Sequence, residues 1–218
     1  MSGELWTIIV PVKALTHAKS RMGGTSPSPS ALASAFLTDV LASVTASTSV
    51  REVVVATGDT DVSALARACG ANVVDDTGHE GINTAVTAAA GHRGTSTAIA
   101  VVVSDLPRLT TSALDRALSA GEQHQTSFVA DLAGTGTTIW LAESRAWMPP
   151  AFGVGSRERH RVAGSVDLVA TLDADFAAAV LAARCDVDTP ADLMHAGLPP
   201  LGQHTRALLD AGGSNSGA

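Results

Sequence analysis

The stretch TAIAVVVSDLP, residues 97–107, decides the fold, because it is the most hydrophobic strand pattern in the chain. Its apolar run ends at Asp105, and Pro107 stops it. A strand that is apolar on both faces is typical of a parallel sheet covered by helices on each side. With aromatic residues at only 3%, the core of such a fold must consist of Ala, Val, Leu and Ile.

Strand and helix patterns alternate outward from this stretch. The other predicted strands are short apolar runs between turn signals, at residues 7–12, 52–57, 71–76, 127–132 and 137–142. The clearest predicted helices have apolar residues at helical spacing, at residues 31–44, 81–91 and 112–120, with a shorter one ending at Cys69. Residues 163–183 predict a strand and a helix, and residues 185–194 a short strand that runs into a proline-started helix.

This order predicts an α/β fold, namely a three-layer αβα, Rossmann-like domain with a mostly parallel central sheet. The chain of 218 residues suits one such domain, which we expect over residues 1–205. No internal repeat or linker divides it. Residues 206–218 end in GGSNSGA, which predicts a flexible C-terminal tail.

Composition excludes several classes of protein. The formal net charge of −7, with 14 basic residues, gives no electrostatic footprint for nucleic acid. The apolar stretch of residues 6–12 is too short for a secretion signal, and no window reaches the ~20 apolar residues of a membrane span. Cys69 and Cys185 lack the spacing of a zinc site or a disulfide framework. We therefore expect a cytoplasmic protein without a membrane partner.

Ligands of parallel α/β sheets bind at the carboxyl ends of the strands, and cations follow the first predicted strand. These are Lys13, Lys19 and Arg21 in PVKALTHAKSRM. Several donors at a strand-to-helix turn suit a polyphosphate, although a solvated basic turn explains them equally well. The chain has neither a Walker-type phosphate loop nor the glycine fingerprint of dinucleotide binding.

Carboxylates follow two other predicted strands. Asp186 and Asp188 alternate in CDVDTPADL, so their side chains point to the same face. Such like charges repel unless a cation lies beside them, and Mg²⁺ commonly takes one or two protein carboxylates. We predict that Asp105, Asp186 and Asp188 form a magnesium site. The alternative for Asp105 is a helix N-cap, and Asp192 is expected in the first turn of the next helix.

Two glycine loops carry hydroxyl groups: GTGTT, residues 134–138, and FGVGS, residues 152–156. Glycine lets the backbone approach an anion closely, and Thr or Ser can donate a hydrogen bond to it. Either loop by itself is more often a plain turn. We expect His160, which follows FGVGS, to be a surface charge rather than a group that balances a phosphate.

Taken in order, the motifs resemble a known family. AKSRM, GINTA, SDLP, ADLAGTGTT, FGVGS and CDVDTPADL are similar to motifs of the guanylyltransferases of deazaflavin coenzyme (F-420) biosynthesis, which act on phosphoenolpyruvate or 2-phospho-L-lactate. The resemblance covers residues 8–193. It implies the nucleotidyltransferase fold, similar to that of enzymes that attach GMP to the molybdenum cofactor.

The resemblance further implies that GMP passes from GTP to phosphoenolpyruvate or 2-phospho-L-lactate, with release of pyrophosphate, giving enolpyruvyl- or lactyl-diphospho-guanosine with Mg²⁺ as cofactor. The residues it assigns are Thr137, Gly153 and Ser156 for the acceptor's phosphate and carboxylate; Asp105, Asp186 and Asp188 for the metal; Lys13, Lys19 and Arg21 for the triphosphate; and Asn83 and Thr84 for the base and ribose. Lys13, Lys19, Arg21 and Asp105 would carry the catalysis.

Two alternatives stay open at this point. One is another nucleotidyltransferase of the same fold that uses a different nucleotide or acceptor, phosphoglycerate included. The other is a non-catalytic nucleotide-binding protein, against which three convergent carboxylates argue. The number of metal ions and the formation of a homo-oligomer are not decided by the sequence.

Overall fold

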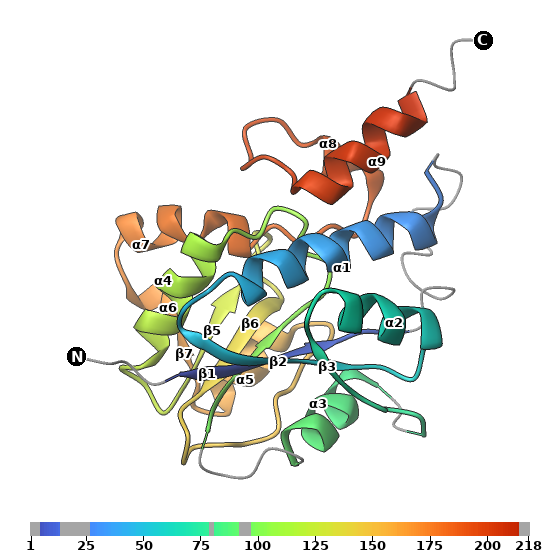
Figure 1. The fold of residues 1–218 in the computed structure, drawn as a ribbon. Coiled ribbons are helices and arrows are strands. Elements are labelled where there is room, and N and C mark those ends of the chain that lie inside the picture. The colour runs from blue at the N-terminus through green and yellow to red at the C-terminus, as the bar shows by residue number, and fades with distance from the viewer. Residues whose placement is uncertain (1–4, 14–26, 79–80, 92–96, 214–218) are drawn as a thin grey trace.

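Seven strands form one sheet in the computed structural model, which describes residues 5–13, 27–78, 81–91 and 97–213 (Figure 1). They are β1 (Trp6–Pro11), β2 (Val50–Ala56), β3 (Asn72–Val74), β4 (Ala98–Val102), β5 (Thr126–Ala130), β6 (Thr137–Ala142) and β7 (Val166–Asp167). Their order is β3-β2-β1-β4-β6-β5-β7. Among these strands β6 alone is antiparallel to its neighbours. The predicted mostly parallel sheet is confirmed.

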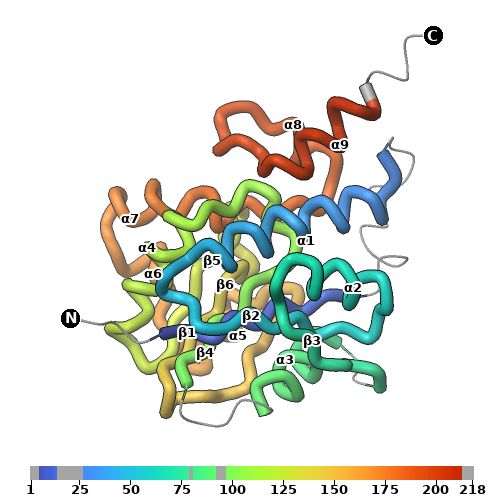
Figure 2. Tube along the Cα trace, viewed as in Figure 1, coloured from blue at the N-terminus to red at the C-terminus, as the bar shows by residue number. Residues whose placement is uncertain are grey.

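Helices cover both faces of this sheet (Figures 1 and 2). They are α1 (Pro29–Thr45), α2 (Thr60–Ala68), α3 (Ile82–Gly91), α4 (Thr111–Gly121), α5 (Ser156–Val162), α6 (Leu168–Thr171), α7 (Ala174–Ala179), α8 (Pro190–Met194) and α9 (Gln203–Gly213), with a 3-10 turn at Leu181–Ala183. Within the described ranges, no helix combines the length and the apolar character needed to cross a membrane.

The alternation of side chains along β1 shows how the three layers form. Ile8 and Val10 are fully buried among side chains of α1, α2 and α4. Ile9 lies between them in sequence and is fully buried on the opposite face, among the alanines of α3. Successive side chains of a strand point to opposite faces, so an unbroken apolar strand requires cover on both.

The segment 185–188 is not a strand, so that prediction is wrong. It lies beyond the carboxyl end of β4, where the Val187 N–H donates to the Asp105 carbonyl at 3.0 Å. None of the strands formed by the described residues includes this segment. The proline-started helix is confirmed as α8, whose Asp192 carboxylate accepts from the Thr189 N–H at 2.7 Å. Asp192 therefore lies in the first turn of α8, as predicted, and there it forms a capping box with Thr189.

Helix α9 packs on α1, on the side away from the sheet (Figure 1). The buried Asp39 of α1 accepts the backbone N–H groups of His204 at 2.9 Å and Thr205 at 3.0 Å. These are groups at the start of a helix that lack partners within it. The tail predicted from residue 206 is thus wrong for residues 206–213, because a carboxylate distant in sequence caps this helix; residues 214–218 lie outside the described residues.

Replacing Asp39 with Ala is expected to destabilise the fold, because it leaves the His204 and Thr205 N–H groups unsatisfied. Losing such partners costs about 1–3 kcal/mol, or a fall of several degrees in the melting temperature of a chain of this size. Thermal unfolding followed by circular dichroism measures it. Gln203→Ala, an exposed change at the same helix start, is the control, and equal melting temperatures for both variants would contradict the capping role.

Candidate active site

The predicted acidic residues come together at the carboxyl end of β4. Asp105 is half-buried just beyond this strand, and the bond from the Val187 N–H to the Asp105 carbonyl brings the segment 185–188 beside it. Val187 is fully buried, while Asp186 is half-buried and Asp188 exposed. Buried Val187 thus lies between two less buried carboxylates, and the prediction that Asp186 and Asp188 share one face stays a prediction.

Electrostatics confirm that these carboxylates are neighbours. The pKa of Asp186 is raised to about 7, first because burial disfavours its charge and then because of the negative charges of Asp105, Asp131 and Asp188. Asp131 was not predicted. It directly follows β5, which runs parallel to β4, so its position at the end of a strand on the same edge of the sheet was the available signal.

Asp131 also shapes the glycine loop of residues 134–138. Its carboxylate accepts the N–H groups of Thr135 and Gly136, each at 2.8 Å. A Cβ on Gly136 would lie 2.5 Å from Oδ2 of Asp131, so this position requires glycine. Since both oxygens of Asp131 are engaged in the loop, this residue adds charge to the cluster while Asp105, Asp186 and Asp188 remain the candidate metal ligands.

Arg184 connects this loop to the acidic segment. Its guanidinium donates to the carbonyls of Ala130 and Asp131, both at 3.1 Å, and its own carbonyl accepts the Leu132 N–H at 2.8 Å. The end of β5 and the residues before Asp186 are thereby held side by side. These contacts of Arg184 use backbone oxygens, so they hold the two segments together without pairing the guanidinium with a carboxylate of the cluster.

In the part of the chain that the structure describes, no group of three or more His, Cys, Asp or Glu side chains could by itself hold a metal ion. A divalent cation at this cluster would therefore share its coordination with a substrate. Mg²⁺ usually binds through one or two carboxylates, and phosphate oxygens and water fill the remaining positions. A buried acid whose pKa is raised by neighbouring acids is stabilised by such a cation.

Of the predicted triphosphate cations, Lys13 is exposed two residues beyond the end of β1. The strand β1 is parallel to β4, so Lys13 follows the same edge of the sheet as Asp105. Lys19 and Arg21 lie outside the described residues, and their role stays a prediction.

The residues predicted for the acceptor lie on two adjoining loops. Thr137 begins β6 and is 7% exposed, while Ser156 begins α5 and is 2% exposed. The loops meet where the Arg157 N–H donates to the Thr135 carbonyl at 3.3 Å. Gly153 has a φ of 117°, a conformation that suits glycine. Among the described residues the Ser156 hydroxyl has no hydrogen-bond partner.

The residues predicted for the base and ribose lie at the start of α3. The amide of Asn83 accepts the Phe152 N–H at 2.8 Å and donates to the Phe152 carbonyl at 3.2 Å. The amide therefore holds the FGVGS loop in place, a role that the sequence did not reveal. Thr84 is exposed and borders an open hollow of about 420 Å³, so its contact with the nucleotide remains a prediction.

His160 is 1% exposed, so the expectation that it is a surface charge is wrong. Its ring lies 5.6 Å from that of Phe128 and 5.4 Å from that of Phe152, centroid to centroid. Burial, with a smaller contribution from the charge of Arg159, lowers its pKa to about 4. The ring is accordingly neutral at physiological pH.

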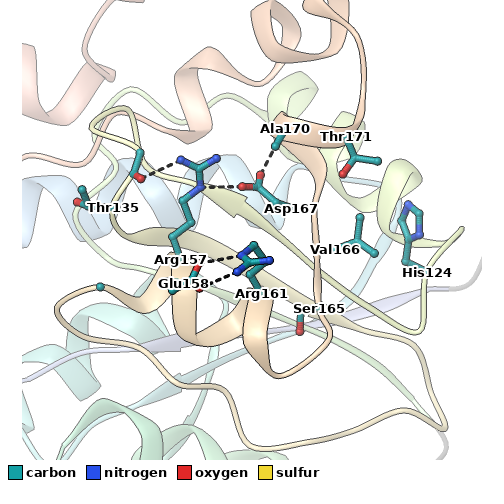
Figure 3. A pocket seen from close by; sticks show the side chains of 12 residues that line it. His124, Thr135, Arg157, Glu158, Arg161, Ser165, Val166, Asp167, Ala170 and Thr171 are labelled. Carbon is teal, nitrogen blue, oxygen red and sulfur yellow. Dashed lines mark hydrogen bonds and ion pairs between the residues drawn. The ribbon is translucent and has the colours of Figure 1, made fainter.

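A hollow of about 780 Å³ borders Thr135 and Gly155 but none of the three predicted metal ligands (Figure 3). Its arginines already have partners: Arg157 pairs with Asp167 at 2.7 Å and Arg161 with Glu158 at 2.7 Å. This hollow is therefore separate from the acidic cluster.

A family model and several known proteins match most of this chain. The model of the family described as "Guanylyl transferase CofC like" matches residues 6–211. The phosphoenolpyruvate guanylyltransferase of Streptomyces avermitilis is 38% identical over 207 residues, 93% of each chain. That of Streptomyces coelicolor is 39% identical over 93% of this chain and 95% of its own, and that of Frankia casuarinae 36% identical over 97% and 79%.

The fold also has a solved counterpart. The crystal structure of a candidate nucleotide-diphospho-sugar transferase from Desulfovibrio desulfuricans superimposes with a TM-score of 0.67 at 16% identity, covering 97% of this chain and 96% of that one. At this identity the likeness concerns the fold, which is the predicted three-layer nucleotidyltransferase type.

Replacing Asp186 with Asn is expected to raise the melting temperature of the metal-free protein at pH 8. A carboxyl group whose pKa is raised from 3.8 to about 7 stabilises the fold below pH 4 and loses that contribution as the pH rises through 7, by at most about 4 kcal/mol. Thermal unfolding at pH 8 and pH 5 measures it. The difference between variant and wild type should be largest at pH 8 and less than half as large at pH 5.

The exposed Asp175→Asn is the matched control, since it removes one charge outside the cluster. His160 is present in the wild type and in the variants alike. Its lowered pKa means that the stability of each of these proteins falls as the pH drops from 6.5 to 4. An Asp186→Asn protein less stable than the wild type at pH 8 would show that no charge strain exists in the cluster.

Proposed function

The chain belongs to the CofC-like guanylyl transferase family, and we propose that it transfers GMP from GTP to phosphoenolpyruvate, releasing pyrophosphate and supplying enolpyruvyl-diphospho-guanosine for coenzyme F-420 biosynthesis. The relatives named phosphoenolpyruvate guanylyltransferase, at 36% to 39% identity, support this acceptor. A second candidate acceptor is 2-phospho-L-lactate, which has the same phosphate and carboxylate groups.

The observation that carries the proposal is the acidic cluster beside two loops of hydroxyl and backbone donors. The charges of Asp105 and Asp188 raise the pKa of Asp186. Thr137 and Ser156 lie on loops that adjoin each other, and Asp131 binds the backbone of the loop that carries Thr137. A reaction between two phosphates needs both kinds of group, one for a bridging cation and the other for the acceptor.

In the reaction, an ionised phosphate oxygen of the acceptor forms a bond to the α-phosphorus of GTP. The bond between that phosphorus and the bridging oxygen to the β-phosphate breaks, and pyrophosphate leaves with the electron pair. The attacking oxygen carries no proton at neutral pH, so no general base is needed. Alignment and charge neutralisation are what the protein must supply.

Asp105, Asp186 and Asp188 would hold Mg²⁺, which supplies the positive charge that lets the two phosphates approach. Lys13, Lys19 and Arg21 would neutralise the departing pyrophosphate. Thr137, Gly153 and Ser156 would bind the acceptor's phosphate and carboxylate. Asn83 and Thr84 would border the nucleoside, with Asn83 acting through the loop that it holds at Phe152.

Incubation with GTP, Mg²⁺ and phosphoenolpyruvate is expected to yield enolpyruvyl-diphospho-guanosine and pyrophosphate, identified by mass spectrometry. Parallel reactions with 2-phospho-L-lactate, 3-phosphoglycerate, and CTP in place of GTP define the specificity. Asp105→Asn is the control, and its turnover should fall at least ~10²-fold, as when a preorganised electrostatic contact is lost. Product formed from CTP but not from GTP would contradict the proposal and indicate another nucleotidyltransferase. No product from any pair of substrates would indicate a non-catalytic binding protein.

Ser156→Ala is expected to raise the KM for the acceptor roughly tenfold, the effect of one lost hydrogen bond to a charged group. The KM for GTP should stay near the wild-type value. Steady-state kinetics with each substrate varied separately distinguish the two. A parallel rise of both constants would move Ser156 into the nucleotide site.

A further inference from the structure

We propose that His160 is a positioning residue that holds Ala151 with one ring nitrogen and, with the other, turns the Thr137 hydroxyl into a donor for the acceptor's phosphate or carboxylate. The inference deepens the proposed function and rests on it, because it takes the acceptor to bind beside Thr137 and Ser156. The residue touches no reacting atom itself.

The tautomer of His160 follows from its two hydrogen bonds. The Ala151 N–H lies 2.8 Å from Nε2, and a backbone N–H can only donate, so Nε2 must be the unprotonated nitrogen. In a neutral ring the proton is then on Nδ1. Nδ1 lies 2.9 Å from Oγ1 of Thr137, so the ring donates and the hydroxyl accepts.

The surroundings keep this tautomer fixed. The ring is enclosed by Phe128 and Phe152, with the ring of Trp140 at 6.5 Å. Protonation of Nε2 would place two N–H groups against each other at the Ala151 contact, inside an apolar enclosure. The low pKa of about 4 agrees with this arrangement.

The tautomer of His160 determines whether the Thr137 hydroxyl can donate to a ligand. Its oxygen accepts from His160, so the hydroxyl proton must point elsewhere, and no other partner for this hydroxyl exists among the residues that the structure describes. A hydroxyl on its own rotates and either donates or accepts. Because the Thr137 hydroxyl is already fixed as a donor, it can bind an anionic ligand without losing rotational entropy at that step.

The same helix provides the second donor. Ser156 and His160 are four residues apart on α5 and therefore lie on one face. The Ser156 N–H is bound to the Gly153 carbonyl at 2.9 Å, which leaves its hydroxyl as the side-chain donor. The bond from His160 to Thr137 thus fixes the distance between the donors on the two loops.

Two isosteric replacements separate the two bonds of the ring. Gln places an amide oxygen near Nε2 and keeps the acceptor for Ala151, but has no donor at the Nδ1 position. Asn places an amide nitrogen near Nδ1 and keeps the donor to Thr137, but does not reach Ala151. We expect His160→Gln to raise the acceptor KM about tenfold with an unchanged KM for GTP, and His160→Asn to raise the acceptor KM less.

Coupling to Thr137 is the second readout. If His160 acts through that hydroxyl, His160→Gln combined with Thr137→Ala should have the acceptor KM of Thr137→Ala alone. His204→Gln, on the exposed start of α9, is the control and should change neither KM. Independent multiplication of the two single effects, or an equal loss with both substrates, would overturn the proposal and leave His160 a packing residue.

The tautomer can be measured without any activity. In protein labelled with ¹⁵N-histidine, the His160 ring should show a proton on Nδ1 between pH 6 and 8, and a proton on Nε2 would refute the inference. The product assay with the wild type distinguishes a failure of the proposed role of His160 from a failure of the proposed function. Product formation with an unshifted acceptor KM in His160→Gln refutes only the role of His160; absence of product with every acceptor refutes the proposed function and this inference together.

Discussion

Several carboxylates lie close together because backbone hydrogen bonds hold the segments that carry them, and the proposed catalytic site depends on this constraint. Asp186 lies within the electrostatic influence of three other acids, a grouping that opposes folding. Backbone contacts keep it in place: the Val187 N–H binds the Asp105 carbonyl, and Arg184 binds the carbonyls at the end of β5. The repulsion within this group lowers the stability of the metal-free protein, and the proposed cation would offset it.

The buried side chain of Arg108 holds the segment that follows the acidic residues. Arg108 is 5% exposed and donates to the carbonyls of Leu193, at 2.9 Å, and of Pro199. Asp39 binds the start of α9 further along. Both contacts fasten the C-terminal elements to α1 and to the chain after β4. The segment with Asp186 and Asp188 is thus held on both sides, although it does not pair as a strand.

The proposed acceptor side is organised differently, through neutral groups. Asn83 and His160 hold backbone atoms at Ala151 and Phe152, and the donors proposed for the ligand are hydroxyls. This division suits a ligand with two negative groups. Strong cations close to the attacking oxygen would reduce its nucleophilicity, whereas hydroxyl donors hold it with less withdrawal of charge.

By itself the sequence determined the layers and the ligand-bearing edge. The unbroken apolar pattern of residues 97–107 requires cover on both faces, and parallel strands bring Asp105 and Lys13 to one edge. The carboxylates of CDVDTPADL were also singled out from the sequence, and Asp186 lies within the electrostatic influence of Asp105 and Asp188. Local periodicity and capping chemistry act over a few residues, so they are readable without coordinates.

Tertiary structure alone decided the contacts between residues distant in the chain. Asp39 turns the predicted tail into α9, Asp131 joins the acidic cluster, and His160 is enclosed by aromatic rings and carries no charge. Each outcome depends on which partner folding brings within hydrogen-bond distance and on how much water it removes. Burial and pairing are properties of the packed chain, and no local pattern specifies them.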